Sequence, residues 1–98
     1  MLHLLVLEYV GTEADAEPFV ADHVAFLEEH HRKGVFLLSG QAVPSTRGGA
    51  ILAVAVDTAE VERIAGEDPF VKAGVARYAI ATIQPSRVHP VLARLLEA

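Results

Sequence analysis

VFLLSGQAVPSTRGGAILAVAV, residues 35–56, contains two apolar stretches separated by a polar loop. The stretches VFLLSG (35–40) and AILAVAV (50–56) flank QAVPSTRGG, which carries one proline and two adjacent glycines. Strand-forming residues on both sides of such turn residues predict a β-hairpin. The run TRGG (46–49) offers a second interpretation, an anion cradle of backbone N–H groups and Arg47, but no strand-to-helix phosphate motif surrounds it.

The segment before the hairpin predicts a strand followed by a helix. Residues 2–10, LHLLVLEYV, are β-rich and nearly continuous in hydrophobicity, as expected of a central strand. Acidic residues in GTEADAEP then precede a helix with Pro18 in its first turn, where negative charge and proline are favourable. The helix is expected to end at about Lys33, with Gly34 just beyond its end.

The segment after the hairpin repeats this pattern in reverse. Asp57 or Thr58 is expected to cap a short helix over 58–66, and EDPFVKAG (67–74) forms a compact segment before a strand, RYAIATIQ (77–84). Residues 88–97 carry apolar residues on one face of a short terminal helix. The order βαββαβ predicts an α+β, ferredoxin-like sandwich, with both main helices on one face of an antiparallel sheet.

Composition and length indicate one domain that pairs with a copy of itself. The chain has 98 residues, of which 52% are hydrophobic, so residues 1–98 are expected to form a single domain with apolar surface to spare. The uncovered sheet face would expose an apolar patch, which favours a homodimer with paired sheets. The strand residues expected to supply the surplus are Leu5, Leu7, Leu37, Leu52, Val54 and Ile83.

Charge and cysteine content narrow the partners and the compartment. A formal net charge of −5 with only eight Lys and Arg residues disfavours a nucleic-acid partner. The chain has no cysteine, which rules out disulfides and thiolate catalysis and makes the cytoplasm the default location. The run Leu4 to Leu7 is too short for a membrane span, and no basic segment precedes it.

His23 lies within the apolar face of the first helix, together with Phe19, Val20, Val24, Phe26 and Leu27. A buried imidazole needs a hydrogen-bond partner. One interpretation is a core histidine bonded to a backbone carbonyl. The other is a pair with Asp68, whose carboxylate would fix the imidazole tautomer and make His23 a general base. Asp68 has an alternative role as the N-cap of the FVKAG turn.

The motifs DHVAFLEEHHRKG, VFLLSGQ, GGAILAV and EDPFVKAGVARYAI resemble those of the YCII-related family over nearly the whole chain. The resemblance implies a dimeric α+β barrel in which His23 and Asp68 form an acid/base dyad. It also implies a small-residue strand end at Ser39 and Gly40, where Gln41 replaces the usual proline. A few members of the family eliminate chloride from chlorinated aromatic compounds.

These residues predict a small-molecule enzyme that moves protons without a metal or cofactor. A histidine with a carboxylate, and no cysteine, fits elimination, isomerisation or hydrolysis-type chemistry on a small cyclic or carbonyl-bearing compound. Ser39, Gly40, Phe70 and Tyr9 are the candidate substrate-binding residues, although Tyr9 has packing as its alternative role. The alternative functions are a non-catalytic ligand-binding or regulatory dimer, and a barrel of the monooxygenase or lactone-isomerase type.

The other histidines have simpler interpretations. His30 and His31 are adjacent on the helix, so their side chains point about 100° apart and are poorly placed to share a metal ion. His3 and His89 are isolated in the sequence, and each is expected at the surface or at an edge.

Overall fold

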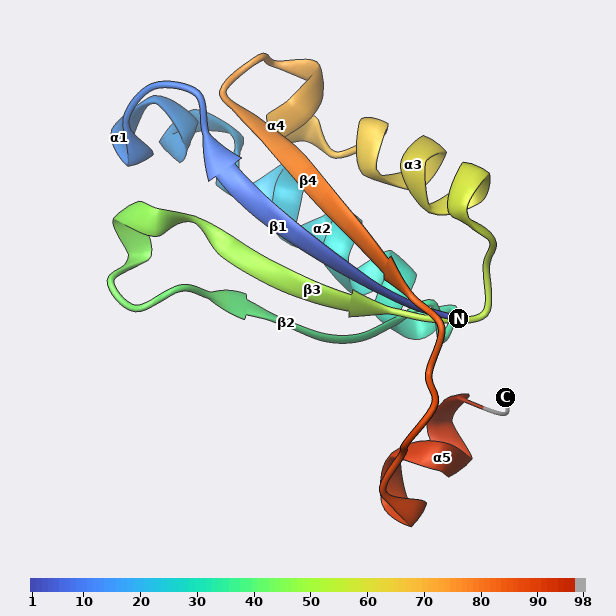
Figure 1. Ribbon diagram of the computed structural model, residues 1–98. Helices are drawn as coiled ribbons and strands as arrows, with labels where there is room; N and C mark the ends of the chain where they lie inside the picture. The colour runs from blue at the N-terminus through green and yellow to red at the C-terminus, as the bar shows by residue number, and fades with distance from the viewer. Residues whose placement is uncertain (97–98) are drawn as a thin grey trace.

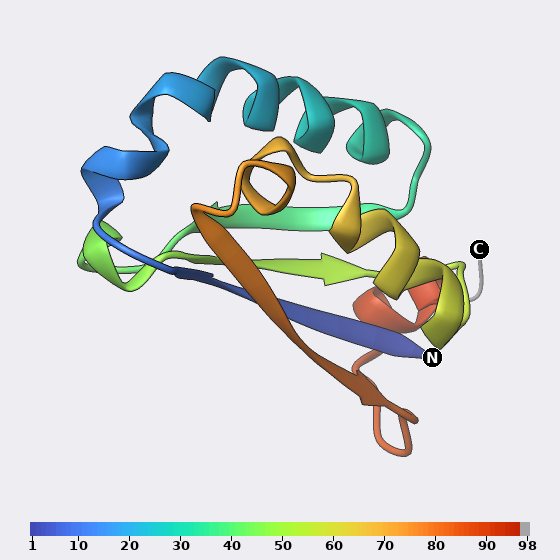
Figure 2. The ribbon, with the colours of Figure 1, turned by 90° about the horizontal axis from the view of Figure 1, so that it is seen from above.

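The computed structural model describes residues 1–96 and consists of one sheet with helices on one side (Figures 1 and 2). The strands are β1 (Leu2–Tyr9), β2 (Phe36–Gln41), β3 (Gly49–Ala53) and β4 (Ala76–Ile83). The helices are α1 (Glu13–Ala16), α2 (Val20–Arg32), α3 (Thr58–Gly66), α4 (Pro69–Lys72) and α5 (Pro90–Leu96), and the 3₁₀ turns are η1 (Glu17–Phe19) and η2 (Ser45–Arg47). Residue 97, the predicted end of the terminal helix, lies outside the described residues. In the part of the chain described, every helix is too short or too polar to cross a membrane.

The sheet has the strand order β2-β3-β1-β4, with every neighbouring pair antiparallel. Helices α2 and α4 lie over one face, and α3 adds Val61, Ile64 and Ala65 to the core beneath that layer (Figure 2). This arrangement confirms the predicted ferredoxin-like α+β fold. Helix α5 stands away from the sheet beyond the end of β4 (Figure 1).

The first predicted helix is divided into three parts. Thr12 caps α1 through a capping box with Asp15, the turn η1 contains Pro18, and α2 begins only at Val20. The predicted helix end is confirmed, since Lys33 is the C-cap and Gly34 has a φ of 77°. The helix therefore changes direction just before the turn that carries His23.

Strand β3 ends at Ala53, three residues earlier than the apolar run AILAVAV suggested. Ala55 has a φ of 68°, in the left-handed region, and it turns the chain toward α3. Val54 leaves the ladder between β1 and β3 and donates its N–H to the carbonyl of Val35 at 2.9 Å. The sequence offered no glycine to mark this turn.

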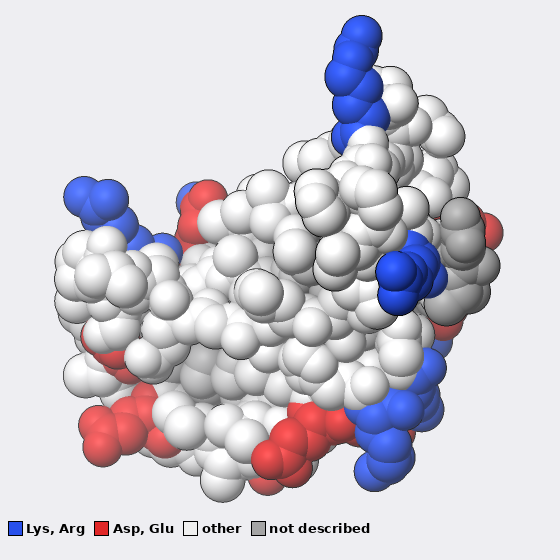
Figure 3. Space-filling model, turned by 90° about the horizontal axis from the view of Figure 1, so that it is seen from below, with Lys and Arg blue, Asp and Glu red and all other residues white. Residues whose placement is uncertain are grey.

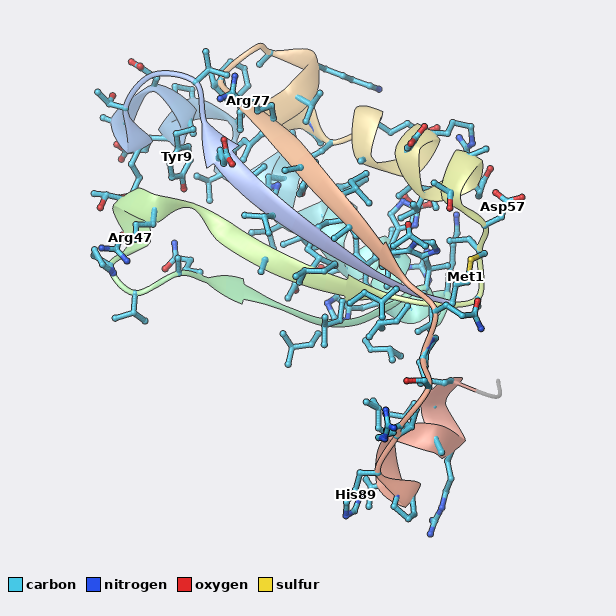
Figure 4. The ribbon with its side chains drawn as sticks, viewed as in Figure 1. Met1, Tyr9, Arg47, Asp57, Arg77 and His89 are labelled. Carbon is cyan, nitrogen blue, oxygen red and sulfur yellow. The ribbon has the colours of Figure 1, made fainter. Side chains whose placement is uncertain are left out.

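The predicted hairpin is confirmed, with η2 in its loop, and Gly48 is required at its end. Gly48 has a φ of 93°, and a Cβ atom there would lie 1.8 Å from the carbonyl oxygen of Leu7. No larger residue fits this approach of the loop to β1. Arg47 lies at the loop, directed away from the sheet (Figure 4).

Some of the strand residues predicted to lie on the uncovered face of the sheet lie on the covered face instead. Leu5, Leu7 and Val54 were expected to add to the uncovered apolar surface, but all three are buried in the core. The register places other residues on the uncovered face, because side chains alternate along a strand. The large apolar side chains of that face are Leu2, Leu4, Val6, Leu38, Leu52 and Ile83. It ends at an ion pair between Glu8 and Arg77, of which Arg77 is labelled in Figure 4.

His3 is a core residue, so the prediction that it lies at the surface or an edge is wrong. Its side chain is fully buried, and its Nδ1 and Nε2 lie 2.9 Å from Thr82 Oγ1 and 2.7 Å from the carbonyl oxygen of Val56. The position faces inward on the central strand β1, so its ring nitrogens need internal partners. His89 is exposed at the start of α5, as expected (Figure 4).

Candidate functional site

Asp68 links the turn before α4 to the centre of the site. The residue before Pro69 is restricted to extended conformations, and Asp68 has φ −58° and ψ 127°. Its Oδ1 accepts the backbone N–H of Phe70 at 2.9 Å, which caps α4. The N-cap interpretation of Asp68 is therefore correct, but it describes only one of the bonds that this carboxylate accepts.

His23 contacts the same carboxylate, as one of the two interpretations of the sequence predicted. Its Nδ1 lies 2.9 Å from both Oδ1 and Oδ2 of Asp68. The Asp68 side chain is fully buried, whereas that of His23 is 14% exposed. Because an ionised carboxylate only accepts hydrogen bonds, Nδ1 carries the proton and Nε2 is left as the free ring nitrogen.

Tyr78 is the third side-chain partner, and sequence reasoning missed it. Its hydroxyl, on the inward face of β4, donates to Asp68 Oδ2 at 2.6 Å. Burial, followed by the charge and the hydrogen bond of Asp68, raises the pKa of Tyr78 well above its usual value. The available signal was the alternation of Ala76, Tyr78 and Ile80 on the last strand, because a buried tyrosine hydroxyl normally needs a partner.

Phe70 holds the imidazole from one side. The rings of Phe70 and His23 are stacked, with centroids 4.0 Å apart and planes 3° from parallel. The same residue thus gives its backbone N–H to Asp68 and its ring face to His23. These two contacts restrict the rotation of the imidazole, so the residues Asp68, Pro69 and Phe70 together fix the position of His23.

A cavity of about 620 Å³ opens beside His23, between α2 and the sheet. All six predicted site residues are associated with it: Asp68 lies behind the imidazole, and the wall includes His23, Phe70, Tyr9, Ser39 and Gly40. The wall also includes Val20 and Val24, which accounts for their exposure on the otherwise buried side of α2.

The polar part of the cavity wall includes carboxylates that the sequence analysis did not single out. Glu13 and Glu17 lie at the α1 end, and Gln41 lines the wall where the family pattern has proline. Tyr9 lies beside α1 (Figure 4), and burial together with the charge of Glu13 raises the pKa of its hydroxyl. None of the lining residues among those described is Lys or Arg. In the view from below in Figure 3, both basic and acidic side chains lie mainly around the edges of a largely uncharged surface.

The adjacent histidines His30 and His31 have separate surroundings. His30 is buried against Phe26 and Phe36, and its Nδ1 has no partner within the described residues. Burial and the nearby charge of Lys33 lower the pKa of His30. His31 instead forms a hydrogen bond with Ser39, with Nε2 and Oγ 2.8 Å apart.

Comparison with known proteins agrees with this fold. Residues 1–84 match the family model of the YCII-related domain, and α5 lies beyond the matched residues. The fold is similar to that of 5-chloro-2-hydroxyhydroquinone dehydrochlorinase from Burkholderia phenoliruptrix, solved in complex with 2,5-dihydroxybenzoquinone. That likeness has a TM-score of 0.72 at 22% sequence identity and covers 88% of this chain and 96% of the other. No curated protein sequence matches this chain.

Proposed function

This chain belongs to the family of YCII-related domains, and on that premise we propose that it is an enzyme that moves protons on a small ring compound bearing hydroxyl or carbonyl groups. His23 is the proposed acid/base group and Asp68 the residue that orients it. Elimination and isomerisation are the reactions that this pair supports best.

The proposal is carried by one observation, the placement of the two nitrogens of His23. Nδ1 is bound to a fully buried carboxylate, while the ring lines a cavity large enough for a small molecule. Such an imidazole offers Nε2 as a base toward the cavity, and Asp68 stabilises the imidazolium that forms after proton transfer.

The chemistry requires only proton movement and, for elimination, a leaving group. Nε2 takes a proton from a carbon or oxygen of the substrate, and the electron pair left behind moves into the ring. In an isomerisation, the imidazolium returns the proton to another atom of the same substrate. In an elimination, the imidazolium first returns the proton to the ring carbon that carries the leaving group. Removal of a proton from a second hydroxyl by Nε2 then expels a group such as chloride, and Nε2 releases that proton to water. The fold shared with a dehydrochlorinase that was solved with a dihydroxyquinone supports this choice of substrate class.

The wall of the cavity supports the same substrate class. Apolar side chains such as Leu7, Leu27 and Ile51 make up much of it, which suits a ring, while a few polar groups are available to substituents. Glu13 and Glu17, without a nearby basic lining residue, disfavour a strongly anionic substrate such as a phosphate ester.

Exchange of substrate protons with deuterated water tests the proposal. We expect the wild-type protein to exchange ring or hydroxyl-adjacent C–H protons in a panel of chlorinated and unchlorinated hydroquinones, with chloride release from 5-chloro-2-hydroxyhydroquinone as a second readout. His23→Gln keeps most of the side-chain volume but cannot carry a proton at neutral pH, so we expect a loss of about 10²- to 10⁴-fold. His89→Gln, at an exposed position just before α5, is the matched control.

The alternative is a module that binds a ligand without turnover. It would be favoured if members of the panel bound tightly and perturbed His23, yet neither exchange nor chloride release exceeded the rate with His23→Gln.

We further propose that the uncovered sheet face pairs with that of a second copy to form a dimeric α+β barrel. Leu38, Ile83 and Val6 on that face are 55%, 46% and 36% exposed, and apolar side chains gathered on one face favour association. We expect sedimentation at twice the chain mass of 10.5 kDa. Val6→Glu should give monomers while Glu62→Lys, on exposed α3, should not; a wild-type monomer at micromolar concentration would contradict the pairing.

A cytoplasmic location is also a proposal, based on the absence of cysteine from the sequence. Cell fractionation tests it, and recovery of the protein from an extracytoplasmic fraction would contradict it.

A further inference from the structure

His31 and Ser39 form a second histidine pair at the cavity, separate from His23 and Asp68. His31 lies in the last turn of α2 and Ser39 lies on β2, and both are partly buried. Their Nε2 and Oγ atoms are 2.8 Å apart, within the range of a well-formed hydrogen bond. The ring of His31 also packs edge-on against Phe36, with centroids 6.0 Å apart, which limits its rotation.

Ser39 lies between His31 and the cavity. It pairs with Ile51 across the hairpin, and both residues line the cavity, whereas His31 is not part of the wall. His31 is therefore placed to act on the cavity only through the Ser39 hydroxyl. This arrangement parallels that of Asp68, which is not part of the wall but bonds His23 and Tyr78, two residues that are.

We propose that His31 is a positioning residue that holds the Ser39 hydroxyl as the second polar anchor of the cavity, where it binds an oxygen atom of the substrate. The inference rests on the proposed function, because it concerns the same cavity and the same substrate. It assigns His31 a role in substrate binding and limits the substrate to compounds with oxygen atoms at two separate positions.

The hydrogen-bonding capacity of this pair suits a substrate oxygen that changes between hydroxyl and carbonyl. When Nε2 of His31 accepts the serine proton, the lone pairs of Oγ are free to accept a hydrogen bond from a substrate hydroxyl. When Nε2 carries a proton and donates it to Oγ, the serine O–H is free to donate to a substrate carbonyl. One residue can thus bind both forms, as an isomerisation or an elimination on an oxygenated ring requires.

The spacing of the two pairs indicates how the substrate is held. His23 and His31 are eight residues apart on α2, which corresponds to an axial rise of about 12 Å, more than two turns. A small ring that contacts both pairs must therefore carry its polar atoms at separate positions, as in a 1,4-dihydroxybenzene. A ring with a single hydroxyl can satisfy only one of the two.

Binding of hydroquinone and of phenol tests this assignment, with the histidine ring signals followed by NMR. We expect the wild-type protein to bind hydroquinone about 3- to 10-fold more tightly than phenol, the effect of one added neutral hydrogen bond. Ser39→Ala and His31→Phe should remove the preference for hydroquinone over phenol, while Ser39→Thr, which keeps the hydroxyl, should retain it. If the His31–Ser39 bond only tethers α2 to β2, its loss in Ser39→Ala and His31→Phe would instead weaken the binding of both probes equally.

The outcomes separate this inference from the proposed function. Equal affinity of the wild type for both probes, or an unchanged preference in Ser39→Ala, overturns the role of Ser39 and His31. If His23 signals still respond to the probes in that case, the His23 site stands. If neither probe perturbs His23 in the wild-type protein, both proposals fail for this class of substrate.

Discussion

Replacing Asp68 by asparagine tests the linked roles of this residue, because the change keeps the side-chain shape and removes the charge. The carboxylate accepts hydrogen bonds from the backbone of Phe70, the hydroxyl of Tyr78 and Nδ1 of His23. In Asp68→Asn, the amide oxygen can keep the bond from Phe70, and the tyrosine hydroxyl can rotate to accept from the amide. The amide NH₂ group then also lies beside Nδ1 of His23, which favours Nδ1 as an acceptor and the ring proton on Nε2.

The expected loss of stability follows from these bonds. Hydrogen bonds to a charged group contribute roughly 1 kcal/mol more than neutral ones, so weakening the bonds of His23 and Tyr78 costs about 2 kcal/mol. Removing a buried charge offsets part of that cost. We therefore expect a net loss of about 1 to 2 kcal/mol, which lowers Tm by roughly 5 to 15 °C in a domain of this size.

The expected loss of activity is larger than this change in stability. With its proton on Nε2, the neutral imidazole can no longer accept a proton from a substrate in the cavity. Proton exchange should therefore fall by about 10²- to 10⁴-fold, at a temperature where the variant is fully folded. Urea unfolding and the deuterium-exchange assay measure the two effects on the same sample.

Asp57 provides a matched control, because it caps α3 in the same way. Its side chain accepts the backbone N–H of Glu60 at 2.8 Å, at an exposed position. Since asparagine is as good an N-cap as aspartate, Asp57→Asn should change stability by only a few tenths of a kcal/mol. If Asp68→Asn behaves like Asp57→Asn in both assays, Asp68 is only a helix cap and the reasoning is wrong.

Three further changes have defined outcomes. The pKa of Tyr78 is raised in the folded protein, so the stability that its neutral hydroxyl contributes is fully present below the unfolded pKa of about 10 and is lost as the pH rises above it. Urea unfolding at pH 8 and at pH 11 should therefore show a loss of stability at the higher pH, and this loss should be smaller in Tyr78→Phe. The pKa of His30 is lowered in the folded protein, so the stability linked to its neutral ring is present above the unfolded pKa of about 6.5 and is lost as the pH falls below it. His30→Leu removes this titration and also the unpartnered Nδ1. The variant should therefore have a higher Tm than the wild type at pH 7, and the difference should be larger at pH 5. A drop in Tm for His30→Leu would show that its ring packing outweighs its unpartnered nitrogen. Gly48→Ala should cost roughly 2 to 4 kcal/mol, because its Cβ would meet the carbonyl of Leu7 at a positive φ, and a melting temperature equal to that of the wild type would contradict the close approach.

Local signals in the sequence predicted the order of the elements well. The glycines at positions 34 and 48 mark turns that the structure confirms, and Asp57 caps the second helix as expected. The early end of β3 was not predictable from such signals, because an alanine adopts the left-handed conformation there without glycine or asparagine. Tertiary contact, here the bond from Val54 to Val35, decides where that strand stops.

The candidate site was predictable where a motif or a resemblance identified it. The contact of His23 with Asp68 followed from an apolar-face histidine and the residues DPF, but the distance between elements 45 residues apart required the fold. Tyr78 and His31 each join the site through one hydrogen bond across elements, which no spacing in the sequence reveals. The burial of His3 was not predicted, because nearly all residues of its strand are apolar and the sequence does not show which alternate residues face the core. Only the pairing register of the strands decides this.

The ring nitrogens of His23 provide the most direct test of the central claim, that Asp68 holds this histidine with Nε2 free to move protons in the cavity. A ¹⁵N-correlated NMR spectrum of the wild-type protein at pH 8, assigned with the His23→Gln variant, reports which nitrogen carries the proton. We expect the proton on Nδ1 and an unprotonated Nε2, and we expect Nε2 to respond when hydroquinone is added. A proton on Nε2, with Nδ1 unprotonated beside Asp68, would contradict the account.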